Sequence, residues 1–214
     1  MTTAIDMGKN NSDVGKVRNH GFSLVEILIV MFIIIVVAAM GIPKLTTMTG
    51  NLRTRGDARD LNAAIVLAKM RAASDFARVR VYADLSANTF RIEELESGST
   101  AWKINGCPNS CIGDQLLSRG VSFGYGSLTT PPNGVATLTQ APLCLQNDLV
   151  ATYANTACIM FNSRGVPVDS TWTPTPSDAL YVTDGKSVSG VTLSATGLTR
   201  IWRSDANTAT WNEH

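Results

Sequence analysis

The feature that most constrains this chain is an apolar run of about 20 residues near its N-terminus, from Phe22 to Gly41, which contains one charged residue, Glu26. A helix of that length reaches about 30 Å, the hydrocarbon thickness of a bilayer. Lys16 and Arg18 precede the run and would keep that side in the cytoplasm. The run therefore predicts a membrane-spanning helix over residues 22–42.

Three interpretations of this segment compete. The first is a plain signal anchor. The second is a cleaved secretory signal, because "VVA" ending at Ala39 resembles a cleavage site. Glu26 argues against the second, since it interrupts the apolar segment, and the apolar character also continues past Ala39. A carboxylate in a membrane span needs a partner or must reach the headgroups, and the third interpretation supplies a partner.

The third interpretation rests on the letters "GFSLVE", residues 21–26, followed by the apolar run and Pro43. This pattern resembles the N-terminus of type IV prepilins and type II secretion pseudopilins. The resemblance implies that a membrane peptidase removes a leader, residues 1–21, by cutting between Gly21 and Phe22, and that Phe22 is then N-methylated. It also implies that Glu26 meets the terminal amine of a neighbouring subunit during assembly. The alternative is a Glu26 that only reaches up to the headgroups.

Beyond the span, Pro43 predicts a kink or local melting of the helix, because proline removes a hydrogen bond and clashes with the preceding turn. Residues 43–78 then predict an amphipathic continuation of the helix, whose apolar stripe is Leu61, Ile65, Ala68, Ala72 and Phe76. We expect its charged residues to form a solvated face with i,i+4 pairs: Arg53, Arg55, Asp57, Arg59, Asp60, Lys69, Arg71 and Asp75.

The remaining chain, residues 79–214, predicts a β-rich domain. Residues 79–95 switch to an alternating pattern around the turn "SAN", which indicates a β-hairpin. Gly, Pro and Asn clusters separate the further expected strands: Gly120–Gly126, Gly134–Thr139, Ala157–Asn162, Ala179–Thr183, Ser187–Ser194 and Leu198–Arg203. The predicted fold class is α+β, a lollipop in which a long helix, membrane-spanning in its first half and amphipathic in its second, packs on an antiparallel β-sheet or β-sandwich.

Two further segments narrow the resemblance. The helical block "LNAAIVLAKMRAASDFARVRVYADL" is followed late in the chain by "FNSRGVP" and by "GVTLSATGLTRIWR". Together they resemble the GspH/FimT group of pseudopilins and minor pilins, in which a long helix precedes β-sheets and the last strand follows a Thr-Gly turn. The match is loose between Ala101 and Ala157, and it leaves open whether a secretion pseudopilus or a type IV pilus is served.

Composition and motifs favour no enzyme. The net charge is +1, and the two histidines, His20 and His214, lie in or next to the chain ends, which weighs against a histidine metal site or catalytic triad. We expect no metal and no cofactor. The acidic side chains have ordinary interpretations. An edge strand and turn, with charges that oppose aggregation, accounts for Glu93, Glu94 and Glu96. Polar loops contain Asp169, Asp178 and Asp184, whose spacing does not resemble a known calcium-binding loop.

Four cysteines, Cys107, Cys111, Cys144 and Cys158, allow three pairings. A domain outside the inner membrane lies in an oxidising space, which favours disulfides. One bridge would close the short loop "CPNSC", and a second would join Cys144 to Cys158 around a polar loop. A four-cysteine zinc site is the alternative, but neither pair has the usual C-x2-C spacing.

The resulting functional hypothesis is a structural subunit, minor rather than major, of a type IV pilus or a type II secretion pseudopilus. The resemblance implies as partners a prepilin peptidase, other pilin subunits, the inner-membrane assembly platform and, before assembly, membrane lipid. It implies a single-pass inner-membrane protein with a cytoplasmic N-terminus and a periplasmic domain. The alternative is a minor pilin that binds DNA through Arg200, Trp202 and Arg203. Against this alternative, Leu198 replaces an arginine of such DNA binders, and a terminal strand with Ile201 inward explains the same residues.

Overall fold

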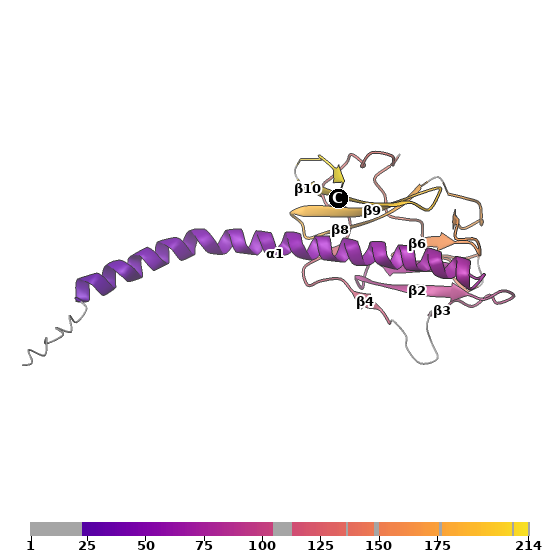
Figure 1. Ribbon diagram of the computed structural model, residues 1–214, viewed down its shortest axis with the longest axis horizontal. Coiled ribbons are helices and arrows are strands. Elements are labelled where there is room, and N and C mark those ends of the chain that lie inside the picture. Colours follow the sequence, from indigo (N-terminus) through magenta and orange to yellow (C-terminus); the bar gives the residue numbers. More distant parts are fainter. Residues whose placement is uncertain are drawn as a thin grey trace, which may run out of the picture. The chain divides into compact units, whose positions relative to one another are not determined.

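Figure 1 shows the computed structural model of the chain. The structure describes residues 23–104, 113–135, 137–147, 150–175, 177–206 and 208–213, and of residues 41–47 it describes the backbone alone. The chain divides into two compact units, residues 1–43 and residues 44–214.

Helix α1 spans Leu24–Ser74 and so contributes to both units. The backbone stays helical through Pro43, so the local melting expected at this proline is not seen. A kink at Pro43 stays a prediction. Among the described residues, no helical stretch qualifies by length and apolarity as able to cross a membrane.

The C-terminal end of α1 lies earlier than the sequence pattern predicted. The last turn is closed by the amide of Asp75, which donates to the carbonyl of Arg71 at 2.9 Å. Phe76 follows in the left-handed conformation, with a φ of 50°, and its side chain is 79% exposed. A residue outside the helix no longer follows the 3.6-residue period, so the placement of Phe76 on the apolar stripe was wrong. The other four members of the stripe are fully buried.

Two antiparallel sheets follow the helix (Figure 1). The first has the strand order β3-β2-β1-β6-β7, with β4 also paired to β2, and its strands are β1 (Arg78–Asp84), β2 (Thr89–Leu95), β3 (Lys103–Ile104), β4 (Gln115–Leu116), β6 (Thr156–Phe161) and β7 (Pro167–Val168). The second has the order β11-β10-β9-β8-β5, and its strands are β5 (Ser122–Phe123), β8 (Ser177–Thr183), β9 (Ser187–Ser194), β10 (Thr199–Asp205) and β11 (Asn212–Glu213).

The sequence pattern predicted most of these strands. The hairpin of residues 79–95 is confirmed as β1 and β2, and the last four expected strands are confirmed as β6, β8, β9 and β10. Of Gly120–Gly126 only the two residues of β5 form a strand.

The expected strand Gly134–Thr139 was wrong, because its described residues form no strand. Close to this segment, a side chain bonds to the backbone of β8 in place of strand pairing. The side-chain amide of Gln140 donates to the carbonyl of Tyr181 at 2.8 Å and accepts from the Tyr181 amide at 2.9 Å. A side-chain amide thus satisfies the backbone of β8 where a neighbouring strand would otherwise do so.

One hydrophobic core joins the helix to both sheets. Leu61 and Ile65 of α1 meet Val79 and Val81 of β1 and Leu180 of β8 within one cluster of buried side chains. In Figure 1 the C-terminal part of α1 runs along strands of both sheets, which agrees with this cluster. The expected α+β architecture, a helix packed on antiparallel sheets, is therefore confirmed.

Two glycine turns contact α1 at Lys69. Gly165, in the turn between β6 and β7, has a φ of 71°, and a Cβ atom there would lie 3.1 Å from the Lys69 carbonyl oxygen. Gly197, in the turn between β9 and β10, has a φ of 76°, and its carbonyl accepts a 3.0 Å hydrogen bond from the Lys69 ammonium. Both turns need glycine for a left-handed backbone and for a close approach to the helix.

Candidate functional site

The N-terminal part of α1 presents apolar side chains on every side. Between Leu24 and Met40 nearly all of them are exposed, including Phe32 at 66% and Ile35 at 66%. A helix that is apolar all round is stable only when it is buried, in a larger assembly or in lipid. This surface therefore requires an apolar environment that the described residues of unit 1 do not supply.

Glu26 is the single charged residue from Ser23 to Met40. It is exposed in the first turn of α1, where the Ile27 amide donates to the Ser23 carbonyl at 3.2 Å. The partial positive charge of a helix N-terminus favours a carboxylate at this position. Among the described residues, no cation lies within ion-pair distance of Glu26.

Gly21 and Phe22 lie outside the described residues. The cleavage between them, the methylation of Phe22 and the pairing of its amine with Glu26 therefore stay predictions. What the structure adds is the helical frame: Glu26 is four residues after Phe22, which is about one helical turn.

The two C-terminal arginines lie on opposite faces of β10, because they are three residues apart in a strand. The Nε of Arg200 lies 3.6 Å from a carboxylate oxygen of Glu213, and an Nη of Arg203 lies 3.8 Å from one of Asp205. The structure therefore does not bring Arg200 and Arg203 together on one surface, and each already has an acidic neighbour.

Trp202 is buried, with 4% of its surface exposed, and its indole N–H donates to the hydroxyl of Thr192 at 2.9 Å. We expected this side chain to face outward, and it does lie on the face of β10 opposite Ile201, which packs on the core. It is nevertheless covered, so the expectation of an exposed ring was wrong. A buried indole does not offer a free face on which a base could stack.

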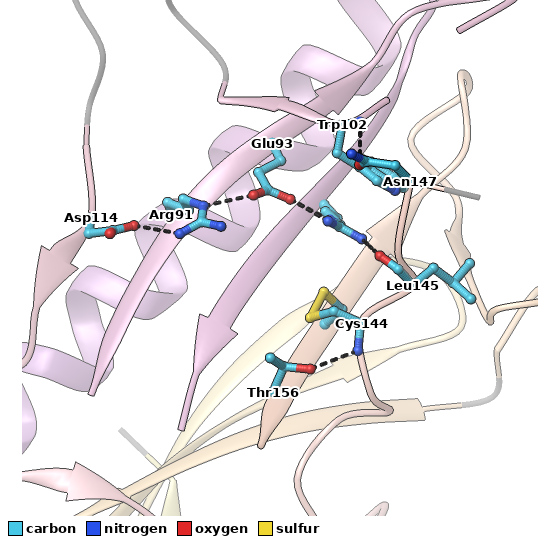
Figure 2. A network of polar contacts seen from close by, with 10 residues as sticks. Arg91, Glu93, Trp102, Asp114, Cys144, Leu145, Asn147 and Thr156 are labelled. Atoms are coloured by element: carbon cyan, nitrogen blue, oxygen red, sulfur yellow. Dashed lines mark hydrogen bonds and ion pairs between the residues drawn. A yellow bond between two sulfur atoms is a disulfide. The ribbon is translucent and has the colours of Figure 1, made fainter. Parts of the chain in front are cut away.

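A disulfide joins Cys144 to Cys158, as the second predicted bridge required. Cys158 lies on β6, and the amide of Cys144 donates to the Thr156 hydroxyl at 3.1 Å, so the bridge pins the loop that precedes β6 onto the first sheet (Figure 2). Cys107 and Cys111 lie outside the described residues, and their bridge stays a prediction.

Sequence reasoning missed a buried ionic network on the face of the first sheet that points away from α1 (Figure 2). Arg80 and Glu93 are cross-strand partners in β1 and β2, and both are at most 4% exposed. A carboxylate oxygen of Glu93 accepts from the Nε of Arg80 at 2.6 Å, and the second oxygen accepts from the Nε of Arg91 at 2.7 Å. Arg91 in turn donates to Asp114 at 2.8 Å.

The rest of the Arg80 guanidinium is also satisfied. An Nη donates to the Leu145 carbonyl at 2.6 Å, and the Trp102 ring centroid lies 4.0 Å from Cζ. Burial lowers the pKa of Arg80, while the charge and hydrogen bond of Glu93 act in the opposite direction. For Arg91, burial also lowers the pKa, but Asp114 and Glu93 together outweigh it and raise the pKa.

The edge-strand interpretation of Glu93 was wrong for this reason. Strand β2 has β1 on one side and β3 and β4 on the other, so it is not an edge of the sheet. The available signal was Arg80, a charge between two buried valines, opposite a glutamate in the predicted hairpin. The sequence interpretation took Glu93 as an edge-strand charge and did not consider its pairing with Arg80.

Other acidic residues also have structural partners. Asp57, expected on a solvated helix face, is buried and accepts from the amide and hydroxyl of Ser118; burial raises the pKa of Asp57 although these hydrogen bonds lower it. Asp169 and Asp184 each accept backbone amides within their own turns. Within the part of the chain that the structure describes, no group of three or more acidic, histidine or cysteine side chains is placed to hold a metal ion.

Comparison with known proteins bears on the N-terminal segment. Residues 16–42 match the family described as the prokaryotic N-terminal methylation motif. The match covers a short N-terminal part of the chain, and it supports the interpretation of that segment as a prepilin-type N-terminus. The match includes Gly21, Phe22 and Glu26, the residues from which the resemblance was first inferred.

No curated protein matches the chain. Among solved structures it is similar to the minor pseudopilin EpsH from the type 2 secretion system of Vibrio cholerae, with a TM-score of 0.40 and 13% identity, over 70% of this chain and 94% of that one. A likeness of this size carries no argument, so the comparisons bear on the N-terminal segment alone.

Proposed function

We propose that this chain is a minor structural subunit of a type IV pilus or a type II secretion pseudopilus. The observation that carries the proposal is the N-terminal segment: a methylation motif, one carboxylate in the first turn of α1, and then apolar side chains exposed all round the helix. In a filament, such a surface is covered by the helices of neighbouring subunits. No catalytic constellation enters the proposal.

The proposed sequence of events begins in the membrane. Residues 22–42 anchor the precursor in the inner membrane, with Lys16 and Arg18 on the cytoplasmic side and the β-rich domain in the periplasm. The Cys144–Cys158 bridge supports an oxidising compartment for that domain. A prepilin peptidase then cuts after Gly21 and methylates Phe22, and the assembly platform transfers the subunit into the fibre.

Glu26 has a specific part in this proposal. It pairs with the terminal amine of Phe22 in a neighbouring subunit, which fixes the height at which the new subunit enters. A subunit at the wrong height leaves both charges unpaired in an apolar environment, at a cost of several kcal/mol per ion. An isolated subunit can satisfy Glu26 with water and headgroups instead.

The experiment is the substitution Glu26→Gln, which keeps the shape of the side chain and removes its charge. We expect normal insertion, normal cleavage and a methylated Phe22, but little recovery of the variant in sheared fibres or in crosslinks to other subunits. The matched control is Glu96→Gln, a change in an exposed carboxylate of the β-rich domain that should leave incorporation into the fibre unchanged.

Wild-type recovery of Glu26→Gln in purified fibres, with Phe22 methylated, would contradict the pairing and favour a glutamate that only reaches the headgroups. The contacts of Arg200, Trp202 and Arg203 described above supply no observation in favour of DNA binding, so we do not propose it as a second function.

A further inference from the structure

A small cavity lies between α1 and the second sheet. It has a volume of about 70 Å³, and its lining residues are Arg55, Arg59, Ser189, Ile201, Trp202 and Arg203. A larger open hollow of about 390 Å³ shares Arg55 and Arg203 with it. The cavity and the hollow therefore adjoin at these two arginines, and together they are called the recess.

The fold brings three arginines to this cavity from two distant parts of the chain. Arg55 and Arg59 are four residues apart on α1 and so lie on the same face of the helix. Arg203 lies on β10 directly opposite Ser189 of β9, so these two side chains share the face of the sheet that also carries Ile201. Since Ile201 packs on the core beneath α1, this is the face turned toward the helix.

These positive charges are poorly compensated within the described residues. Neither Arg55 nor Arg59 has an ion-pair partner there, and the Nε of Arg55 is buried with no hydrogen-bond acceptor. Among the described residues that line the recess, the one carboxylate is Asp205, which is 67% exposed and lies 3.8 Å from Arg203. Buried donors in folded proteins almost always have an acceptor, and the Nε of Arg55 can donate to an anion that enters the cavity.

We propose that this cavity binds a compact oxyanion, a single phosphate or carboxylate group, held by Arg55, Arg59 and Arg203. The planar guanidinium is suited to such groups because its N–H donors match two oxygens at once. Pockets that enclose a whole small molecule measure about 300–1,000 Å³. A cavity of about 70 Å³ therefore accepts one charged group and not a complete nucleotide or sugar.

Calorimetric titration of the full chain in a nonionic detergent tests the proposal. One arm uses inorganic phosphate and the other uses acetate, each against sodium chloride at constant ionic strength, so that general charge screening is removed. We expect saturable binding to one site in at least one arm, and the stronger arm identifies the kind of group that the cavity takes.

Variants then locate the site. Arg55→Gln and Arg203→Gln should each weaken binding by about tenfold or more, because each removes a charge-assisted hydrogen bond. Arg164→Gln is the matched control: Arg164 is exposed in the turn between β6 and β7, and its loss should leave the affinity unchanged. Circular dichroism verifies that each variant is folded, and Arg59→Gln, at the most exposed of the three arginines, provides a third site variant.

Two results would overturn the proposal. One is the absence of saturable binding for both anions. The other is wild-type affinity in folded Arg55→Gln and Arg203→Gln proteins, which would place the anion elsewhere. Neither result affects the proposed role in a fibre, because that role depends on the N-terminal segment.

Discussion

The substitution Glu93→Gln tests how much of the stability of the β-rich domain depends on the buried ionic network of Arg80, Glu93 and Arg91. The change keeps the volume of the side chain but removes the charge that two arginines share. Arg91 retains Asp114 as a partner, whereas Arg80, which is 1% exposed, retains the Leu145 carbonyl and the Trp102 and Tyr82 rings but no anionic partner among the described residues. The main consequence is therefore an uncompensated charge at Arg80.

Removal of one partner from a buried ion pair typically costs about 3–5 kcal/mol. For a domain of this size, each kcal/mol lowers the melting temperature by about 2–4 °C, so we expect a decrease of roughly 6–20 °C. Thermal unfolding followed by circular dichroism, together with urea unfolding, measures both quantities. The matched control is Glu96→Gln, whose partner Lys103 is 59% exposed; an exposed pair contributes about 0–1 kcal/mol.

A double variant tests whether the unpaired charge of Arg80 causes the loss of stability. Replacing both partners, as Arg80→Met with Glu93→Leu, should recover most of the stability, because apolar residues of similar volume leave no charge to desolvate. If Glu93→Gln and Glu96→Gln lower the free energy of unfolding equally, by less than about 1 kcal/mol, Arg80 is hydrated in solution and the reasoning is refuted.

Three other predictions follow from the same contacts and motifs. Gly21→Leu should leave the precursor uncut, since the peptidase must accept a small residue there, and intact mass of the wild-type mature chain should begin at methyl-Phe22; a different first residue would contradict the motif. Reduction of Cys144–Cys158 should lower the free energy of unfolding by about 3 kcal/mol, the value for a loop of about 15 residues, and unchanged urea midpoints would refute this. Burial and then the charge of a neighbouring aspartate raise the pKa of Asp178 from 3.8 to about 6. The protonated form of Asp178 therefore stabilises the fold fully below pH 3.8, and this stabilisation is lost as the pH rises through about 6. The free energy of unfolding should fall by about 3 kcal/mol over this range. Unfolding curves between pH 4 and pH 7.5 measure the decrease, which Asp178→Asn should abolish.

Much of the fold could be predicted from the sequence because its signals are local. The apolar run, the 3.6-residue stripe from Leu61 to Ala72 and the alternation of residues 79–95 each depend on neighbours within one element. The same holds for the N-terminal motif, which is a run of adjacent residues. The pairing of Cys144 with Cys158 was also accessible, since the two residues flank one short polar loop.

What the sequence did not reveal depends on which elements lie against one another. The alternation correctly placed Arg80 on one face of β1, but the sequence did not show that the loop containing Leu145 and the Trp102 ring cover this side chain. Phe76 continues the helical spacing, yet the chain leaves the helix before it. In both cases a pattern within one element says which way a side chain points and not what covers it.

The candidate sites divide in the same way. Glu26 was identified from the sequence alone, because its significance comes from adjacent residues in one helical turn. The recess at Arg55 and Arg203 has no sequence signature, since those residues are far apart in the chain and the expected surface combined Arg203 with Arg200 instead. Only the packing of α1 on the second sheet brings Arg55 to Arg203, because contacts between distant segments are decided by the burial of a shared core and not by local spacing.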